Sequence, residues 1–193
     1  MAAMLMGAWS LQSCDNEPTK EVWLDEFGQD SCYVQDWGML EVNRSVVHTP
    51  LTVNGVVYER GLGAHSISRL LYDLDGKAVS ISGLAGADDK NLFAGKLQFK
   101  ILGDKKELWK SGVMQKGDPV KEFNVNLKGV DKVLLLVEEC GDGIMYDHAD
   151  WLNVKITTRG DVKPVPAWAK PVAKEKYILT PPAPESPDRK SVV

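Results

Sequence analysis

The segment Lys96-Leu97-Gln98-Phe99-Lys100-Ile101 alternates charged or amide side chains with large apolar ones at every second position. In an extended chain, successive side chains point to opposite faces, so this pattern predicts a strand with one buried face. The same alternation recurs at 122–127 and 152–157. No window shows the apolar spacing of an amphipathic helix or an alternation of strands with helices. We therefore expect an all-β protein.

Other segments supply further strands and the turns between them. An Asn-Gly pair, Asn54-Gly55, stands between β-branched residues, which is the strongest short-range signal for a two-residue hairpin. The uninterrupted apolar run at 133–137 is typical of a central strand covered on both faces. With further strands expected at 70–74 and 78–85, the sequence predicts an antiparallel β-sandwich of roughly eight or nine strands.

The overall composition excludes several classes of protein. The 193 residues are 44% hydrophobic and 26% charged, which suits one domain with a sizeable core. There are 23 basic and 27 acidic residues and no Lys/Arg-rich stripe, so we do not expect nucleic acid as a partner. No apolar run approaches the roughly 20 residues of a membrane-spanning helix. Three cysteines without a CxxC pair argue against a zinc finger or a disulfide-dense miniprotein.

The two ends of the chain differ from its centre. The first 14 residues are mostly apolar and end in Leu11-Gln12-Ser13-Cys14, which resembles a bacterial lipobox. This resemblance implies that residues 1–16 hold an export signal, that Cys14 is lipidated, and that the protein is exported and anchored at the bacterial cell envelope. No Lys or Arg precedes the apolar run, and the alternative is an apolar N-terminus with a chance cysteine. The lipid anchor would be the only contact with a membrane.

Proline sets the C-terminal end apart. Seven of the ten prolines lie in the last 33 positions, where a packed sheet could not use them, because proline donates no ladder hydrogen bond. We therefore assign 17–160 to the β-sandwich and 161–193 to a Pro-rich linker or tail that adds no strand.

Common catalytic motifs are missing from the sequence: there is no GxSxG elbow, no HExxH and no P-loop. The segment Gly61-Leu62-Gly63-Ala64-His65-Ser66 begins like a dinucleotide-binding fingerprint, but it lies between strand-like segments and does not open a helix. We expect its glycines to let the backbone turn tightly beside His65.

The densest polar cluster is a predicted loop at 141–151, which contains Asp142, Asp147, His148 and Asp150. Taken alone, it fits a catalytic dyad, a calcium site, a sugar-binding rim or a solvated turn. A second polar loop at 86–91 follows another predicted strand. Carboxylates gathered on several loops offer the acceptors that both Ca²⁺ and sugar hydroxyls need.

Many separated motifs between about 22 and 158 resemble the NPCBM/NEW2 domain in order and approximate spacing. They are Trp37-Gly38, Asn43, Pro50-Leu51, Tyr58, Gly61-Leu62-Gly63-Ala64-His65-Ser66, Tyr72-Asp73-Leu74, Gly86-Ala87-Asp88-Asp89, Phe99, Gly103-Asp104, Leu108-Trp109-Lys110-Ser111-Gly112, Gly141-Asp142-Gly143 and Asp147-His148-Ala149-Asp150-Trp151. The resemblance implies a carbohydrate-binding module similar to family 51, with a galactose-binding-like jelly-roll sandwich. Such modules are usually attached to bacterial glycoside hydrolases, and relatives bind galactosides and blood-group-type glycans.

The expected function is therefore a non-catalytic module that binds galactose-type glycans and holds an associated glycosidase, or the cell surface, near them. The tail at 175–182 also looks like the linker into the catalytic part of Bacteroidetes α-galactosidases, so one alternative is the N-terminal part of such an enzyme without its catalytic domain. Two others are a small hydrolase that uses Asp147, His148 and Asp150, and an adhesin-like module with a protein ligand.

We expect sugars to bind where loops converge at one end of the sandwich. A neutral histidine offers one donor and one acceptor to the axial O4 of galactose, and a carboxylate accepts from a neighbouring hydroxyl. An exposed tryptophan would cover the apolar face of the ring, although burial of that side chain is the alternative. The candidate sugar-binding residues are Trp37, His65, Asp88, Asp147 and His148.

Relatives with this sandwich often carry a structural Ca²⁺, which the resemblance extends to this chain. Its expected ligands are Asp36 with the carbonyl groups before Asn43, or Asp147 with Asp150. The remaining cysteines, Cys32 and Cys140, are either a disulfide of an exported protein or two buried thiols.

Overall fold

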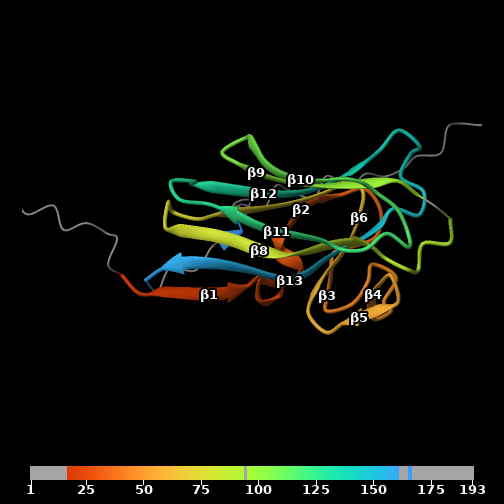
Figure 1. Cartoon of the computed structure of the whole chain (residues 1–193), viewed down its shortest axis with the longest axis horizontal. Coiled ribbons are helices and arrows are strands. Elements are labelled where there is room, and N and C mark those ends of the chain that lie inside the picture. Colours follow the sequence, from red (N-terminus) through yellow and green to blue (C-terminus); the bar gives the residue numbers. More distant parts are fainter. Residues whose placement is uncertain (1–16, 94, 161–164, 167–193) are drawn as a thin grey trace, which may run out of the picture.

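The computed structural model describes residues 17–93, 95–160 and 165–166, and it forms two antiparallel sheets packed face to face (Figure 1). The first sheet has the order β11 (Lys121–Asn126), β8 (Ala78–Ala87), β13 (His148–Arg159), β6 (Gly61–His65) and β3 (Glu41–Val42), with β1 (Thr19–Trp23) also paired to β13. The second has the order β10 (Lys106–Met114), β9 (Leu97–Gly103), β12 (Lys132–Glu139), β7 (Ser68–Asp73) and β14 (Val165–Pro166), with β2 (Cys32–Gln35) also paired to β7. A short helical segment, η2 (Leu24–Ser31), joins β1 to β2.

The expected antiparallel sandwich is confirmed, and so are the strands predicted from alternating residues. Among the described residues there are 14 strands, more than the eight or nine expected. Part of the difference comes from β2, β3 and β14, which are too short to show a period of two, and the rest from strands such as β1, β6 and β10, which were not expected. The Asn54-Gly55 hairpin also forms, as β4 (Leu51–Val53) and β5 (Val56–Tyr58). In the part of the chain that the structure describes, no helix is long and apolar enough to span a membrane.

Aromatic side chains tie the two sheets together in the core. Trp151 is fully buried, and its ring packs edge to face against Phe99 at 4.8 Å and Phe123 at 5.7 Å between ring centroids. Trp109, which we expected to be buried as well, is half-buried against Phe123. The alternating apolar residues of β9 point into the same core, as their pattern predicts.

The expectation that the tail adds no strand is wrong at one point. Val165 and Pro166 pair with Asp73 and Tyr72 of β7 at the edge of the second sheet. An edge strand tolerates proline, since a missing donor there leaves no neighbouring strand unpaired. The rest of the predicted linker and residues 1–16, with Cys14, lie outside the described residues.

Close packing over the outer face of the first sheet explains two glycines. A Cβ atom on Gly63 would lie 2.3 Å from the carbonyl oxygen of Arg44, and one on Gly86 would lie 2.6 Å from Val53 of the β4–β5 hairpin. The loop at 43–49 and the hairpin therefore rest directly on this sheet. The expected tight turn beside His65 is wrong, because Gly61 and Gly63 lie within strand β6, where backbone contact rather than turning requires them.

Candidate functional site

Two histidines meet where strands β6 and β13 run side by side. The antiparallel register places His65 directly opposite His148, and their ring centroids are 5.5 Å apart. Both side chains are almost fully buried. His148 and Asp150 are part of β13, so the expectation that 141–151 is a loop is wrong for its last four residues. Strand register, rather than a loop, sets the distance between the two imidazoles.

The indole of Trp37 covers this histidine pair. It stacks on His148 with a centroid distance of 5.7 Å and an interplanar angle of 9°, and it lies 5.0 Å from the ring of His65. Trp37 is 48% exposed, which favours the platform interpretation over burial. The sequence prediction thus correctly placed Trp37, His65 and His148 together, although sugar binding by them stays a prediction.

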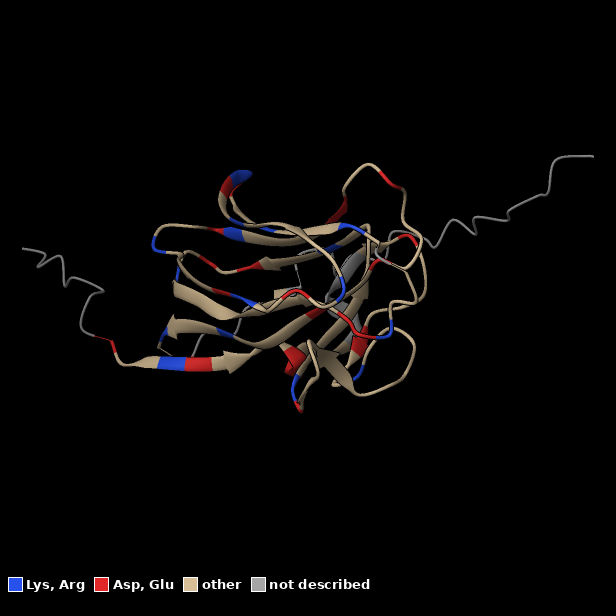
Figure 2. Cartoon of the chain, turned by 45° about the vertical axis from the view of Figure 1, so that its right-hand side comes forward, with Lys and Arg blue, Asp and Glu red and all other residues tan. Residues whose placement is uncertain are grey.

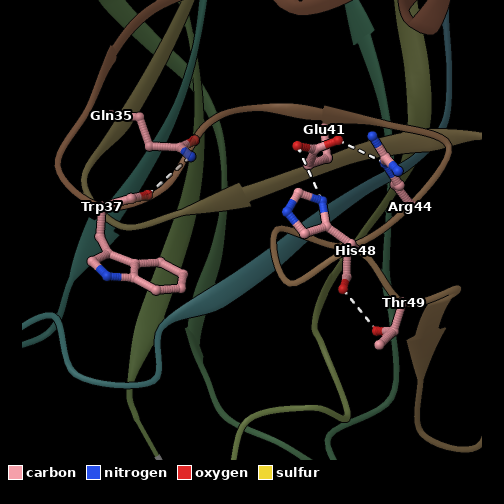
Figure 3. A network of polar contacts seen from close by, with 7 residues as sticks. Gln35, Trp37, Glu41, Arg44, His48 and Thr49 are labelled. Atoms are coloured by element: carbon pink, nitrogen blue, oxygen red, sulfur yellow. Dashed lines mark hydrogen bonds and ion pairs between the residues drawn. The ribbon is translucent and has the colours of Figure 1, made fainter.

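A buried carboxylate supports the loop that carries Trp37 (Figure 3). Glu41 is 2% exposed; it accepts a 2.7 Å hydrogen bond from Nε of Arg44, and its other oxygen lies 3.3 Å from Nδ1 of His48. In Figure 3 the Trp37 indole lies apart from this cluster, and Gln35 donates to the Trp37 carbonyl at 3.0 Å. The loop is therefore braced by its own side chains, and the indole is left for other contacts.

These rings border a cavity of about 540 Å³, a size typical of small-molecule sites. Its lining combines aromatic and imidazole rings and one lysine with apolar side chains. The lining residues are Trp37, Val47, His65, Lys90, Leu92, Ile144, Met145, Tyr146 and His148. Of the apolar residues among them, Leu92 and Met145 are strongly exposed, so part of the wall faces solvent. No carboxylate is among the lining residues.

Hydrogen bonding and burial set the protonation of the two imidazoles. Nδ1 of His65 lies 2.6 Å from the Ser66 carbonyl oxygen, which can only accept, so Nδ1 carries the proton and Nε2 is an acceptor. Burial lowers the pKa of His65 in spite of this bond. Burial, and then the neighbouring His65, lower the pKa of His148. Both rings are therefore neutral at pH 7, with donors and acceptors suited to hydroxyl groups.

Asp88 and Asp147, predicted to contact sugar, are fully buried and do not line the cavity. The two oxygens of Asp88 accept backbone N–H bonds from Thr52 at 3.3 Å and Lys90 at 2.6 Å. Asp147 accepts from the Ser66 hydroxyl. Direct contact with a sugar does not fit these positions, because both carboxylates are used beneath the cavity to hold its loops.

The environment of Asp147 is unfavourable for a charge. Burial raises its pKa to about 6, against the opposing effect of the Ser66 hydroxyl, and Asp142 and Glu139 add to the rise. Its Oδ1 is buried without a hydrogen-bond partner among the described residues. Burial thus keeps the carboxyl group of Asp147 protonated to a higher pH than usual, at a position between the lining residues Tyr146 and His148.

Sequence reasoning missed Asn91, which holds His148 in place. Its buried side chain donates to the His148 carbonyl at 3.1 Å and accepts from the His148 N–H at 2.9 Å. These are the two backbone hydrogen bonds that a residue of a neighbouring strand would make with His148. The backbone of Asp88 adds a third bond to the same carbonyl. The residue stands in the polar loop noticed in the sequence, but nothing there indicates a partner 57 positions away.

The expected calcium ligands Asp36, Asn43 and Asp150 have separate surroundings. The Asn43 side chain accepts from the Gly61 N–H, the Asp36 N–H donates to the Ile67 carbonyl, and Asp150 is buried against Asp88. In the described ranges no group of three or more His, Cys, Asp or Glu side chains is placed to hold a metal ion.

The buried pair Asp88–Asp150 is the nearest approach to a calcium site, and it does not fit Ca²⁺ well. Both Asp150 oxygens are buried and accept no hydrogen bond from a neighbouring N–H or hydroxyl donor among the described residues. Ca²⁺ needs six to eight oxygens, and two carboxylates supply at most four. Burial and the adjacent Asp88 hold the pKa of Asp150 well above its usual range, so its retained proton can be donated to Asp88. Calcium stays a prediction, to be checked by metal analysis and by whether EDTA lowers Tm.

Of the two cysteines in the β-sandwich, the structure describes the side chain of Cys140. Cys140 is a half-buried free thiol, and burial, with Asp147 next in effect, raises its pKa. The side chain of Cys32 lies outside the described ones.

Comparison with known proteins identifies the family to which the chain belongs. The model of the NPCBM/NEW2 domain matches residues 20–157, which is most of the chain. The chain belongs to the NPCBM/NEW2 family. Its fold matches the solved structure of CBM51 from Clostridium perfringens GH95 in complex with methyl-galactose, with a TM-score of 0.64, 25% identity and coverage of 71% of this chain and 99% of that one.

Two further similarities place NPCBM/NEW2 domains inside larger enzymes. The M60 catalytic domain with CBM51-1 and CBM51-2 from Clostridium perfringens ZmpB matches with a TM-score of 0.66 and 28% identity, over 73% of this chain and 15% of that one. Alpha-1,3-galactosidase B of Akkermansia muciniphila is 29% identical over 130 residues, which are 65% of this chain and 16% of that protein. The region shared with this chain is thus a small part of each, and it is a carbohydrate-binding module.

Proposed function

We propose that this NPCBM/NEW2 module binds galactose-type glycans, without catalysis, in the cavity bordered by Trp37, His65 and His148. The observation that carries the proposal is the pair of neutral imidazoles held side by side beneath an exposed indole. The similarity to a module solved with methyl-galactose supports the choice of sugar.

The chemistry of the rings suits this sugar. Galactose differs from glucose in its axial O4, and Nε2 of His65 offers an acceptor to a hydroxyl group in the cavity. The exposed face of Trp37 can cover the apolar C–H face of a pyranose. A sugar that lacks the matched hydroxyl leaves the imidazole unpaired, at about 1–3 kcal/mol. We expect millimolar affinity for one monosaccharide, about −4 kcal/mol, since the site is open to solvent.

The absence of hydrolysis follows from where the carboxyl groups lie. Most glycoside hydrolases use two carboxyl groups that flank the scissile bond. Among the described residues no carboxylate lines this cavity, and Asp147 and Asp150 are buried beneath the surface. Nitrophenyl α- and β-galactosides should therefore stay intact. Turnover that survives repurification and is lost in Asp147→Ala would favour the hydrolase alternative.

Titration by NMR tests the binding site. Galactose and lactose should produce saturable shifts in the wild type and glucose much weaker ones. His65→Gln and His148→Gln should abolish the preference for galactose, while Trp37→Ala should weaken binding of every sugar. His48→Gln is the matched control, because His48 is 60% exposed and does not line the cavity, and a glutamine at this position can still donate to Glu41. Unchanged binding in both His variants, with the fold intact, would remove this site.

We further propose that the chain is exported and lipid-anchored through Cys14, and that it keeps an associated glycosidase or the cell surface near its glycan. The lipobox-like Leu11-Gln12-Ser13-Cys14 supports the anchor, and the alpha-1,3-galactosidase relative supports the association. In a bacterial host, Cys14→Ala should move the protein from the membrane fraction to the soluble fraction. An unchanged distribution would contradict the anchor.

A further inference from the structure

The consecutive residues Asp88, Asp89 and Lys90 have side chains with two different roles. Asp88 and Asp89 turn toward the β4–β5 hairpin: Asp88 accepts from the Thr52 N–H, and Asp89 accepts from the N–H groups of Asn54 at 3.0 Å and Gly55 at 2.7 Å. The next residue, Lys90, turns the other way and lines the cavity. Its own N–H is bound by Asp88 at 2.6 Å, so the backbone from which the lysine extends is fixed.

The charge at the cavity wall is unbalanced. Of the lining residues that belong to the described part of the chain, Lys90 is the one Lys or Arg, and none is Asp or Glu. Within the described part of the chain, no carboxylate forms an ion pair with the Lys90 ammonium. The nearest acids in the sequence, Asp88 and Asp89, are already occupied by backbone donors. An unpaired ammonium beside neutral imidazoles favours a ligand that brings its own negative charge.

Resting on the proposed function, we infer that the cavity is built for galactosides that carry an anionic substituent, a sulfate ester or the carboxylate of a sialic acid. The imidazoles hold the galactose hydroxyls, and the Lys90 ammonium pairs with the anion. The volume of about 540 Å³ exceeds that of one hexose ring and leaves room for the substituent. A lysine ammonium is a flexible point charge with three donors, so it accepts either oxyanion.

The size of the effect follows from exposure. The Lys90 side chain is exposed at the rim, where ion pairs contribute little and are screened by salt. We therefore expect about a fivefold gain in affinity for an anionic galactoside over its neutral parent at low ionic strength.

Calorimetric or NMR titration with lactose, 3′-sulfated lactose and 3′-sialyllactose tests this inference. The wild type should bind at least one anionic form about fivefold more tightly than lactose, and 0.5 M NaCl should shrink that advantage. Lys90→Gln should erase the advantage, so that lactose and its anionic forms bind this variant with Kd values that agree within about twofold. Lys77→Gln, which removes a lysine at the far end of the sandwich, should behave like the wild type.

The outcomes separate the two proposals. A gain for the sulfated form alone identifies the sulfate ester as the substituent, and a gain for the sialylated form alone identifies the carboxylate. Equal affinity for neutral and anionic forms, or an advantage that persists in Lys90→Gln, overturns this inference and leaves the galactose site standing. If none of the three sugars binds, both proposals fail.

Discussion

The two ends of the sandwich can be followed in Figure 1, and each has an aspartate that accepts two backbone N–H groups. At the end where β7 is joined to β8 and β9 to β10, which we call the turn end, Asp104 accepts from Asp131 and Lys132. At the opposite end, which carries residues 88–93 and which we call the loop end, Asp89 accepts from Asn54 and Gly55. Among the described residues, the cavity lined by Trp37, His65 and His148 lies at the loop end. A carboxylate that caps backbone donors therefore stabilises a surface but does not by itself make a site.

The cavities at the two ends differ in the same way. The turn end has a cavity of about 300 Å³, and its described lining residues include Lys77, Lys128, Arg159 and Glu17 but no aromatic residue. In Figure 2, Lys and Arg positions are interspersed with Asp and Glu positions along the described part of the chain. That nucleic acid is not a partner stays a prediction.

Asn91 should produce the largest difference between the ends. Asn91→Leu leaves the buried N–H of His148 unpaired, while the His148 carbonyl keeps its bond from the Asp88 N–H. We therefore expect a loss of about 3 kcal/mol in the free energy of unfolding and weaker galactose binding. At the turn end, Asn126→Ala removes one exposed bond to the Lys128 N–H and should lower stability by less than about 1 kcal/mol with no effect on binding. Urea unfolding and NMR titration measure both. Equal losses of stability in the two variants would contradict the expected difference between the two ends.

Asp147 should make the loop end sensitive to pH. Its folded pKa of about 6 lies above its ordinary value, so the folded state binds the extra proton between pH 6 and 4. The buried charge therefore destabilises the fold above pH 6, and the penalty disappears as pH falls toward 4. Asp147→Asn should raise the free energy of unfolding at pH 8 by as much as about 3 kcal/mol and have little effect at pH 4. A change that is the same at both pH values would contradict this assignment.

A matched pair of cap deletions sharpens the comparison. Asp89→Ala and Asp104→Ala each remove a carboxylate that accepts two exposed backbone N–H bonds, so each should lower stability by about 1 kcal/mol. Only Asp89→Ala should also reduce affinity, because it loosens the turn that carries Lys90. If Asp104→Ala weakens binding to the same extent, the turn end contributes to recognition as well.

Removal of residues 161–193 should have the smallest effect. The cut takes away β14, of which Val165 is half-exposed and only two residues pair with β7. Thermal unfolding of 17–160 and 17–193 should therefore differ by about 0.5 kcal/mol. A difference of more than about 8 °C in Tm would mean that the tail packs on the domain.

Features that depend on neighbouring residues could be predicted from the sequence, and those that depend on distant residues could not. The alternation at 96–101 depends only on neighbouring residues and one buried face, so β9 was predictable within two positions. The meeting of His65 with His148 was expected from their family motifs, and strand register then makes it definite. Asp88 was expected to contact the sugar, but its carboxylate is buried and accepts a hydrogen bond from Thr52, a hairpin residue 36 positions earlier.

The same reasoning explains the residues that were missed. Asn91 reaches a strand 57 positions later, and no local pattern encodes such a contact. Lys90 belonged to a recognised polar loop, but its direction was decided by the two preceding acids, whose partners lie on another hairpin. A strand as short as β14 carries no period at all.

The strand register that places His65 opposite His148 fixes one part of this site, while the residues that line the rest of the cavity can vary. The spacing of the two imidazoles is held by the backbone ladder of β6 and β13, whereas Lys90, Leu92, Met145 and Tyr146 lie outside the strands. If the proposed galactose site is correct, replacing these four should change the second sugar or substituent that is accepted while the galactose anchor stays. A family of glycan probes with a common anchor and different selectivities could be engineered from this one domain by exchanging two short loops.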